Sequence, residues 1–308
     1  MKKLFITGGH GFLGTALREH LKLSQDYEIL SPARDELDLA DSQAVFDYWS
    51  THKPDILVHA AAFARGLGGN LAAKEDAFLL NEVLVRAPLL AALKLGVERV
   101  VFCGTVAEYA HPYKDLPLKE KDVRSSLPHS GEIYYGLAKR LSNSYLEAIS
   151  TRWGSSVSHV YFTNLYGPGD RFDPESGHVT SSMLLKFSDS LKTGRNDVKL
   201  WGSSETTRDF LYIQDAASAI ARLLEYDFDG LLELNIASGV ETSMGELAKQ
   251  ISKAIDFVGD ISWDLGKPIG IQKRSIDVSK LKSIMPWSPK TLSEGLECTI
   301  SLEPWLTK

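Results

Sequence analysis

The chain has 308 residues, of which 44% are hydrophobic and 24% charged, a composition that suits a globular protein with a large core. Its formal charge of −6 gives no electrostatic reason to expect a nucleic-acid or membrane-surface partner. Two widely separated cysteines, and no apolar run long enough for a signal peptide or a membrane span, lead us to expect a cytoplasmic protein without a disulfide framework or a metal site.

Apolar runs and helical patterns alternate along the first half of the chain. The apolar run at 2–7 ends in glycines and is followed by apolar residues at helical spacing up to residue 23. Further strand-like runs lie at 27–32, 55–62, 99–105 and 157–163, separated by helical patterns over 41–52, 75–96 and 134–154. This alternation predicts an α/β fold of the Rossmann type, with a doubly wound parallel sheet.

From about residue 165 the alternation gives way to loops rich in Gly, Pro, Asp and Ser. We therefore expect residues 1–165 to form an NAD(P)-binding domain, to which a segment at about 205–240 returns. Residues 166–308 are expected to form mainly a smaller, interleaved α/β domain that binds the substrate.

A glycine-rich turn, "TGGHGFLG", joins the first strand to its helix. Gly8, Gly11 and Gly14 permit a tight turn and a close approach of the backbone to a pyrophosphate, whose charge meets the helix N-terminus. The strand-to-helix context favours a dinucleotide site over a merely flexible turn. We expect Phe12 and Leu13, within the same turn, to line that site.

The tip of the second strand, "SPAR", bears on the choice of cofactor. An acid there bonds a ribose hydroxyl of NAD, whereas a base meets the 2′-phosphate of NADP. Glu28 lies early in the strand, Asp35 and Glu36 follow it, and Arg34 stands where a phosphate partner is needed. The pattern favours NADP, with NAD as the alternative if Arg34 is only a solvated surface residue.

Tyr135 and Lys139 in "YYGLAK" are four residues apart, so they share one face of a helix. An ammonium beside a phenol stabilises the phenolate and lowers its pKa from about 10. Thr105, at the end of the fourth predicted strand, is placed to bond the substrate oxygen that Tyr135 protonates. Together these three residues favour a catalytic interpretation over a solvated Tyr/Lys pair.

The sequence resembles the extended short-chain dehydrogenase/reductases, and within them the GDP-L-fucose synthase family. Three of the motifs that carry the resemblance, "TGGHGFLG", "HAAA" and "YYGLAK", are general to the superfamily. Four are more specific to the fucose-synthase branch: "TNLYGPGDRF", "SGHV", "LWGSSETTRDFLYIQD" and "GKPIGIQKRSIDVSKL". The resemblance covers nearly the whole chain.

The resemblance implies a role for each matching residue. Thr105, Tyr135 and Lys139 would form the reductase triad, and a homodimer would form through the helices at about 72–95 and 132–152. Further cofactor contacts are expected at Asp38, Ala60, Ala61 and Asn81. The residues expected to face a nucleotide sugar, probably GDP-linked, are Asn164, His178, Val179, Lys186, Trp201 and Arg208. The alternatives are that Trp201 belongs to the core and that Arg208 forms a structural ion pair with Asp209.

Ala107 departs from the family pattern. Fucose synthases epimerise and then reduce their sugar, and epimerisation needs two groups that transfer protons. The family pair is a cysteine two residues after the hydroxyl residue and a histidine in the "HV" segment. This chain keeps the histidine as His178 and has Ala107 in place of the cysteine. Cys103 precedes Thr105 within the predicted strand, and Glu108 is one residue out of register.

The sequence therefore predicts an NADPH-dependent reductase that acts at C4 of a GDP-linked 4-keto-6-deoxy sugar without epimerising it. The alternatives are a bifunctional epimerase/reductase, an NAD-dependent sugar C4 epimerase and a non-catalytic cofactor-binding protein. The loop "FARGLGGN" lacks the family's usual lysine, which points to a different hexose or to a heptose.

Overall fold

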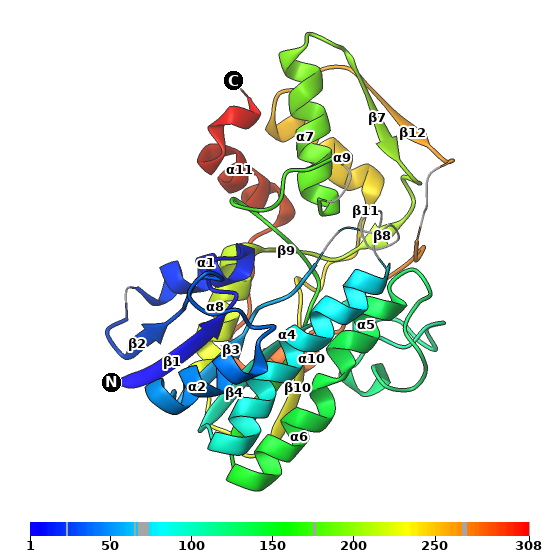
Figure 1. Ribbon diagram of the computed structural model, residues 1–308. Helices are drawn as coiled ribbons and strands as arrows, with labels where there is room; N and C mark the ends of the chain where they lie inside the picture. The colour runs from blue at the N-terminus through cyan, green and yellow to red at the C-terminus, as the bar shows by residue number, and fades with distance from the viewer. Residues whose placement is uncertain (23, 65, 67–73, 175–176, 267–269, 308) are drawn as a thin grey trace.

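A six-stranded parallel sheet forms the centre of the molecule (Figure 1). The computed structural model describes all residues except 23, 65, 67–73, 175–176, 267–269 and 308. The strand order is β10-β5-β4-β3-β1-β2, and each neighbouring pair is parallel. The strands are β1 (Lys2–Thr7), β2 (Tyr27–Leu30), β3 (Ile56–His59), β4 (Arg99–Thr105), β5 (Ser156–Phe162) and β10 (Leu231–Ile236).

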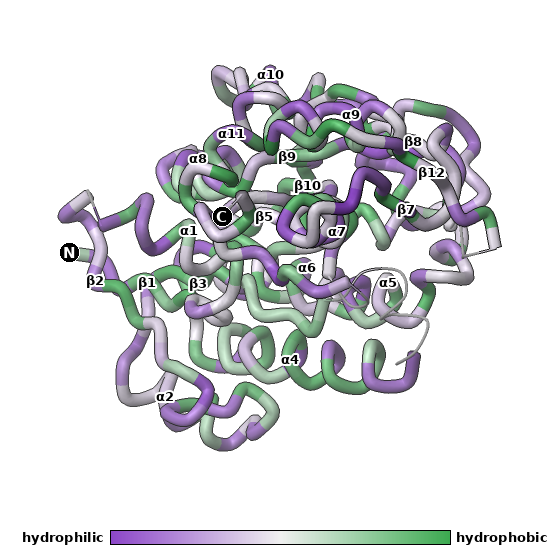
Figure 2. Tube along the Cα trace, turned by 90° about the horizontal axis from the view of Figure 1, so that it is seen from above, coloured by the Kyte–Doolittle hydropathy of each residue, from purple (hydrophilic) through white to green (hydrophobic). Residues whose placement is uncertain are grey.

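Helices cover both faces of this sheet, as Figure 2 shows from above. On one side α1 (Phe12–Leu21) packs against α8 (Ile213–Glu225). On the other side α4 (Lys74–Leu95) packs against α2 (Ser42–His52), α5 (Ile133–Arg140) and α6 (Ser142–Trp153). This arrangement confirms the predicted Rossmann-type fold with a doubly wound sheet.

Two hydrophobic cores result from the alternation of side chains along the strands. Leu4 and Ile6 of β1 belong to the larger core, which includes α1 and α8, whereas Phe5 between them packs in the second core with Trp49 of α2. Successive side chains of a strand point to opposite faces, so one buried strand serves both cores. The side chains of Leu4, Phe5 and Ile6 are all fully buried, which explains why this part of the strand is a continuous apolar run in the sequence.

Most of the remaining elements gather beyond one end of the sheet (Figure 1). Three short strand pairs lie there: β6 (Asn164–Tyr166) with β9 (Phe210–Tyr212), β8 (Thr207–Arg208) with β11 (Thr242–Ser243), and β7 (Asp197–Trp201) with β12 (Asp260–Asp264). The helices there are α7 (Val179–Lys192), α9 (Met244–Ala254) and α11 (Leu292–Leu302), whereas α10 (Ser279–Ile284) packs beside β10 of the sheet. Among the described residues, none of the helices is long and apolar enough to cross a bilayer.

The helix predicted over 134–154 is divided into α5 and α6 at Leu141. Leu141 keeps a right-handed helical backbone, with φ −56° and ψ −29°, and its amide still donates to the Leu137 carbonyl at 3.2 Å. The interruption is therefore a single residue, and Tyr135 and Lys139 both lie in α5.

Candidate active site

The glycine turn has the shape that a dinucleotide site requires. Gly8 has φ +69°, and a Cβ there would lie 2.7 Å from the Ala61 Cα. A Cβ on Gly14 would overlap the Gly8 carbonyl oxygen. Gly11 caps α1 and donates its amide to the Gly8 carbonyl at 2.9 Å. The tight turn therefore leaves room for a ligand to approach its backbone next to the N-terminus of α1, and a helix N-terminus stabilises an anion.

A cleft of about 610 Å³ opens above this turn. It brings together predicted residues from six segments that are far apart in the sequence. Those that line it are Gly8, Gly11, Phe12, Leu13, Gly14, Ala60, Ala61, Thr105, Tyr135, Lys139, Asn164 and His178. Most of the predicted cofactor residues and all of the predicted catalytic residues thus surround one cavity.

A second cavity of about 380 Å³ continues from the turn toward the "SPAR" segment. The two cavities share Gly8, Gly11 and Ala61, and the second is also lined by Arg34, Asp38 and His10. Arg34 is exposed at this end. Asp38 uses its Oδ1 to accept the Ala40 amide at 2.9 Å, so its carboxylate shapes the turn at this end of the cavity.

Asn81 lies buried in α4 and holds the irregular segment that follows β3. Its Oδ1 accepts the Phe63 amide at 2.9 Å, and its Nδ2 donates to the Phe63 carbonyl at 3.0 Å. Asn81 therefore positions the backbone next to Ala61, as a support for the cofactor cleft. Residues 65 and 67–70 of the "FARGLGGN" loop, on which the prediction of a different sugar depends, lie outside the described residues.

Tyr135 and Lys139 line the cleft from the same face of α5, as their spacing predicted. The Lys139 ammonium is buried, donates to the Cys103 carbonyl at 3.1 Å and lies 4.9 Å from the centre of the Phe102 ring. Burial lowers the pKa of Lys139. The two residues are placed as a Tyr/Lys catalytic pair would be.

The expected lowering of the Tyr135 pKa is wrong for this structure. Burial, followed by the charges of Glu108 and Glu132, raises the pKa of Tyr135 well above its usual value. The Lys139 ammonium is directed at a backbone carbonyl and does not offset these effects. Tyr135 therefore stays protonated at neutral pH, which is the state that a proton donor needs.

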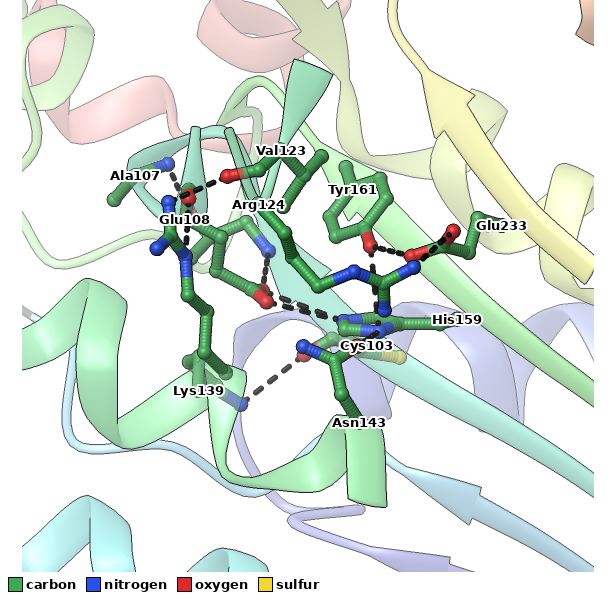
Figure 3. A network of polar contacts seen from close by, with 12 residues as sticks. Cys103, Ala107, Glu108, Val123, Arg124, Lys139, Asn143, His159, Tyr161 and Glu233 are labelled. Carbon is green, nitrogen blue, oxygen red and sulfur yellow. Dashed lines mark hydrogen bonds and ion pairs between the residues drawn. The ribbon is translucent and has the colours of Figure 1, made fainter. Parts of the chain in front are cut away.

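Thr105, the last residue of β4, and Ala107, in the 3-10 helix that follows, line the cleft, whereas Glu108 does not. The Glu108 carboxylate is fully buried, accepts the Thr105 amide at 2.9 Å and lies 3.3 Å from the His159 Nε2 (Figure 3). Burial raises the pKa of the Cys103 thiol to about 12, so this thiol stays protonated. Neither the Glu108 carboxylate nor the Cys103 thiol therefore replaces the proton-transferring side chain that is missing at Ala107.

His178 carries a partner that the sequence did not reveal. Its Nδ1 lies 2.9 Å from Oδ1 of Asp170, and both residues line the cleft. The Asp170 side chain is 2% exposed, and that of His178 is 37% exposed. Asp170 belongs to the quoted "GPGDRF" stretch, but no spacing rule connects it to a histidine eight residues later.

Two arginines lie at one wall of the site: Arg274 is buried and lines the cleft together with Glu132, and Arg208 is partly buried. Arg274 donates its Nε to the Tyr113 hydroxyl at 2.7 Å and its Nη2 to Glu132 at 2.5 Å. Burial, and next the charge of Arg274, lower the pKa of Arg208 to about 10. Within the described part of the chain, no carboxylate lies within ion-pair distance of Arg208. Sequence reasoning missed Arg274 and Glu132, which meet across 142 residues.

The Arg208–Asp209 ion pair, which was the alternative to a substrate-binding role for Arg208, does not form. The Asp209 carboxylate instead accepts the amides of Ser238 and Gly239 at 2.9 and 2.7 Å, and burial raises its pKa to about 6. The Asp209 carbonyl accepts the Asn164 side-chain amide at 2.8 Å. Arg208 instead donates its Nη1 to the Thr207 carbonyl at 2.7 Å, and it is not among the residues that line the cleft.

Lys186 and Trp201 meet in the second part of the chain. The Lys186 Nζ lies 4.4 Å from the centre of the Trp201 ring, and the Trp201 side chain is exposed. Trp201 is therefore not a core residue. Neither they nor Val179, the first residue of α7, lines the cleft described above.

Comparison with known proteins agrees with this geometry. Residues 4–237 match the model of the NAD dependent epimerase/dehydratase family. The chain is 29% identical to GDP-L-fucose synthase of Escherichia coli, over 97% of this chain and 95% of that protein. It is 30% identical to GDP-L-fucose synthase 1 of Arabidopsis thaliana, over 96% and 91% of the two chains.

Two solved structures from Campylobacter jejuni share the fold. A GDP-6-OMe-4-keto-L-xylo-heptose reductase superposes with a TM-score of 0.90 at 23% identity, covering 98% of this chain and 97% of that one. A GDP-mannoheptose C4 reductase with NADP bound superposes with a TM-score of 0.86 at 23% identity, covering 98% of both chains. The protein belongs to the NAD dependent epimerase/dehydratase family.

Proposed function

We propose that the protein is an NADPH-dependent reductase of a GDP-linked 4-keto-6-deoxy sugar, which reduces C4 and leaves C3 and C5 unchanged. The observation that carries this proposal is the combination of an assembled reductase site with Ala107. Thr105, Tyr135 and Lys139 line one cleft, but the position of the family cysteine holds a methyl group. The relatives named above act, by their names, on GDP-linked sugars, and one of the similar structures is a reductase of a 4-keto heptose.

In the proposed reaction the nicotinamide, when bound, supplies a hydride to C4. Tyr135, whose raised pKa keeps the phenol protonated, donates its proton to the oxygen that develops negative charge. The Thr105 hydroxyl bonds the same oxygen and so orients the ketone. Lys139 stands one helical turn from Tyr135, where its ammonium can hold the ribose of the cofactor.

NADP is the proposed cofactor. Arg34 is exposed at the far end of the second cavity, where an adenosine 2′-phosphate would arrive if the pyrophosphate binds at the glycine turn. His10, in the same cavity, adds a second nitrogen base, and its Nε2 lies 3.1 Å from the Ser31 carbonyl. Bound NADP in one of the similar structures also supports this choice.

Arg208 is the proposed ligand of the substrate diphosphate. The Arg208 guanidinium is partly buried, its pKa is lowered first by burial and next by Arg274, and among the described residues it donates a hydrogen bond to the Thr207 carbonyl, so an anion would stabilise its charge. Arg208 can bind a phosphate with two parallel hydrogen bonds. Lys186, with Trp201 beneath its ammonium, is proposed to extend the same binding surface.

A homodimer is also proposed. Large apolar side chains are exposed on α4 and at the ends of α5, including Leu79 at 59%, Tyr134 at 45% and Leu141 at 41%. These two helices pack against each other, so the exposed side chains belong to one side of the molecule. Analytical ultracentrifugation should give twice the chain mass, and Leu79→Glu with Tyr134→Glu should give a monomer.

NADPH oxidation at 340 nm tests the proposed reductase. With freshly prepared GDP-4-keto-6-deoxy-mannose, oxidation should depend on enzyme and be faster with NADPH than with NADH. The UDP-linked counterpart and a Tyr135→Phe variant serve as controls. Absence of oxidation with 4-keto hexoses and heptoses linked to GDP would reject the proposal and favour a cofactor-binding protein or an internally recycled cofactor.

A second candidate function is the bifunctional epimerase/reductase. The observation in its favour is that His178 lies in the cleft with a carboxylate partner, although its family cysteine partner is replaced. The two candidates differ in the configuration of the product at C3 and C5.

A further inference from the structure

We propose that Asp170 is a positioning residue for His178, and that the pair catalyses one-sided exchange of a proton next to the sugar ketone, with retention of configuration. The inference rests on the proposed function, because it assigns a further activity to the same cleft. Exchange without inversion is what a site with one base on one face can perform.

The backbone on both sides of the pair is held in place. The Gly169 amide donates to Glu303 at 2.8 Å, and the Arg171 amide donates to Oδ1 of Asp170 at 2.7 Å. The His178 carbonyl accepts the Ser182 amide at 2.9 Å and the Ser181 hydroxyl at 3.0 Å. The backbone from which the Asp170 and His178 side chains extend is therefore held by hydrogen bonds, and these bonds support the 2.9 Å contact between the two side chains.

The imidazole of His178 is not used to stabilise α7. His178 is the N-cap residue of this helix, yet its side chain makes no capping hydrogen bond. It turns to Asp170, whose side chain is 2% exposed and whose Oδ2 has no hydrogen-bond partner among the described residues. The His178 side chain is therefore directed at a carboxylate that lines the cleft.

The pairing fixes which ring nitrogen can act as a base. A carboxylate only accepts hydrogen bonds, so Nδ1 of His178 carries the proton that it shares with Asp170. Nε2 is then the nitrogen with a free electron pair. Because 37% of the His178 side chain is exposed and the residue lines the cleft, a substrate in the cleft can reach this nitrogen.

The proposed exchange balances without an oxidant or reductant. Nε2 removes a proton from C3 or C5, the C–H electron pair forms the enolate, and the negative charge on the C4 oxygen is stabilised by Tyr135 and Thr105. The proton on Nε2 exchanges with solvent and returns to the same carbon on the same face. Inversion would need a donor on the opposite face, which the methyl group of Ala107 cannot provide.

Exchange is tested apart from reduction. GDP-4-keto-6-deoxy-mannose is incubated with enzyme and NADP⁺ in deuterated water, so that no hydride is available, and deuterium at C3 and C5 is followed by NMR. Enzyme-dependent deuterium at one carbon with unchanged configuration is expected. Asp170→Asn should lower the ratio of the exchange rate to the NADPH-dependent reduction rate by about tenfold or more, and His178→Gln should abolish exchange. Asp41→Asn, which carries the same change of charge at the N-cap of α2, serves as the matched control and should leave both rates unchanged.

A spectroscopic measurement tests the pairing without substrate. In protein labelled with [¹⁵N]histidine, the His178 signals, assigned by their loss in His178→Gln, should show a protonated Nδ1 and an unprotonated Nε2. The Asp170→Asn variant should show a mixture of tautomers. A protonated Nε2 in the wild type, an Asp170→Asn variant in which exchange and reduction fall equally, or reduction without any exchange would overturn the inference. Exchange that persists without NADPH oxidation would support the inference while rejecting the proposed reductase.

Discussion

Removal of the Arg274 guanidinium tests the energetics of the cleft wall. Arg274→Met keeps the length of the side chain but breaks the 2.5 Å pair with Glu132 and the 2.7 Å hydrogen bond that Arg274 donates to the Tyr113 hydroxyl. The side chains of Arg274 and Glu132 are 4% and 22% exposed, so the pair is largely excluded from water. Breaking a buried pair costs about 3–5 kcal/mol, and the partial exposure of Glu132 puts the expected loss near the lower end, about 3 kcal/mol.

The loss should depend on pH in a definite direction. Burial acts to raise the pKa of Glu132, but Arg274 outweighs it, so the pKa in the folded protein lies below its usual value. A lowered carboxyl pKa contributes stability above the unfolded-state value of about 4.3, and that contribution is lost as the pH falls through the folded-state value. The difference between wild type and Arg274→Met should therefore be largest near pH 7 and should shrink below pH about 4.3.

Urea unfolding followed by tryptophan fluorescence measures this difference. Arg86→Met is the matched control, because the Arg86–Glu82 pair is partly exposed and lies within one helix, where such a pair contributes about 0.5 kcal/mol or less. Glu132→Gln combined with Arg274→Met should recover part of the loss, since no unpaired charge remains. A loss below about 1 kcal/mol, or one that grows as the solution becomes acidic, would refute the reasoning.

Further predictions concern catalysis and the cofactor. Tyr135→Phe should lower kcat by about 10²- to 10⁴-fold with little change in NADPH affinity, measured by fluorescence titration; an equal loss of affinity would contradict its role as proton donor. Gly14→Ala should weaken NADPH binding by about tenfold or more, because the added Cβ would overlap the Gly8 carbonyl oxygen. Gly266→Ala is the control and should leave NADPH binding unchanged, because its added Cβ would lie 3.3 Å from the flexible side chain of Asp264. Arg34→Ala should raise KM for NADPH by about tenfold and leave KM for NADH unchanged, and equal effects on both would count against a 2′-phosphate contact.

Local rules predicted those parts of the site that depend on neighbours in the sequence. The turn from Gly8 to Gly14 follows from strand-to-helix geometry, the shared face of Tyr135 and Lys139 follows from helical spacing, and β4 ends at Thr105 as the apolar run indicated. Glu108 was also predicted out of the cleft, but the physical reason differs from strand alternation: residues 106–108 form a 3-10 helix, and the Glu108 carboxylate turns back to accept the Thr105 amide.

Contacts between distant segments were beyond the reach of such rules. Arg274 meets Glu132 across 142 residues and Glu108 meets His159 of β5 across 51 residues, while Asp170 and His178, only eight residues apart, meet at a spacing that belongs to no regular element. The Tyr135 pKa was predicted in the wrong direction for a similar reason: burial and two carboxylates, unseen in the sequence, raise it. Electrostatic effects depend on the whole environment of a group, whereas the spacing of two residues gives only their mutual distance.

The configuration of the product is the most direct test of the central claim. The enzyme is given GDP-4-keto-6-deoxy-mannose and NADPH, and the reduced sugar is examined by NMR at C3 and C5. Retention at both carbons is the predicted result, with Ala107 as the reason that inversion does not occur. Inversion at C3 and C5 would contradict the account and would mean that the cleft contains a second proton-transferring group in place of the family cysteine.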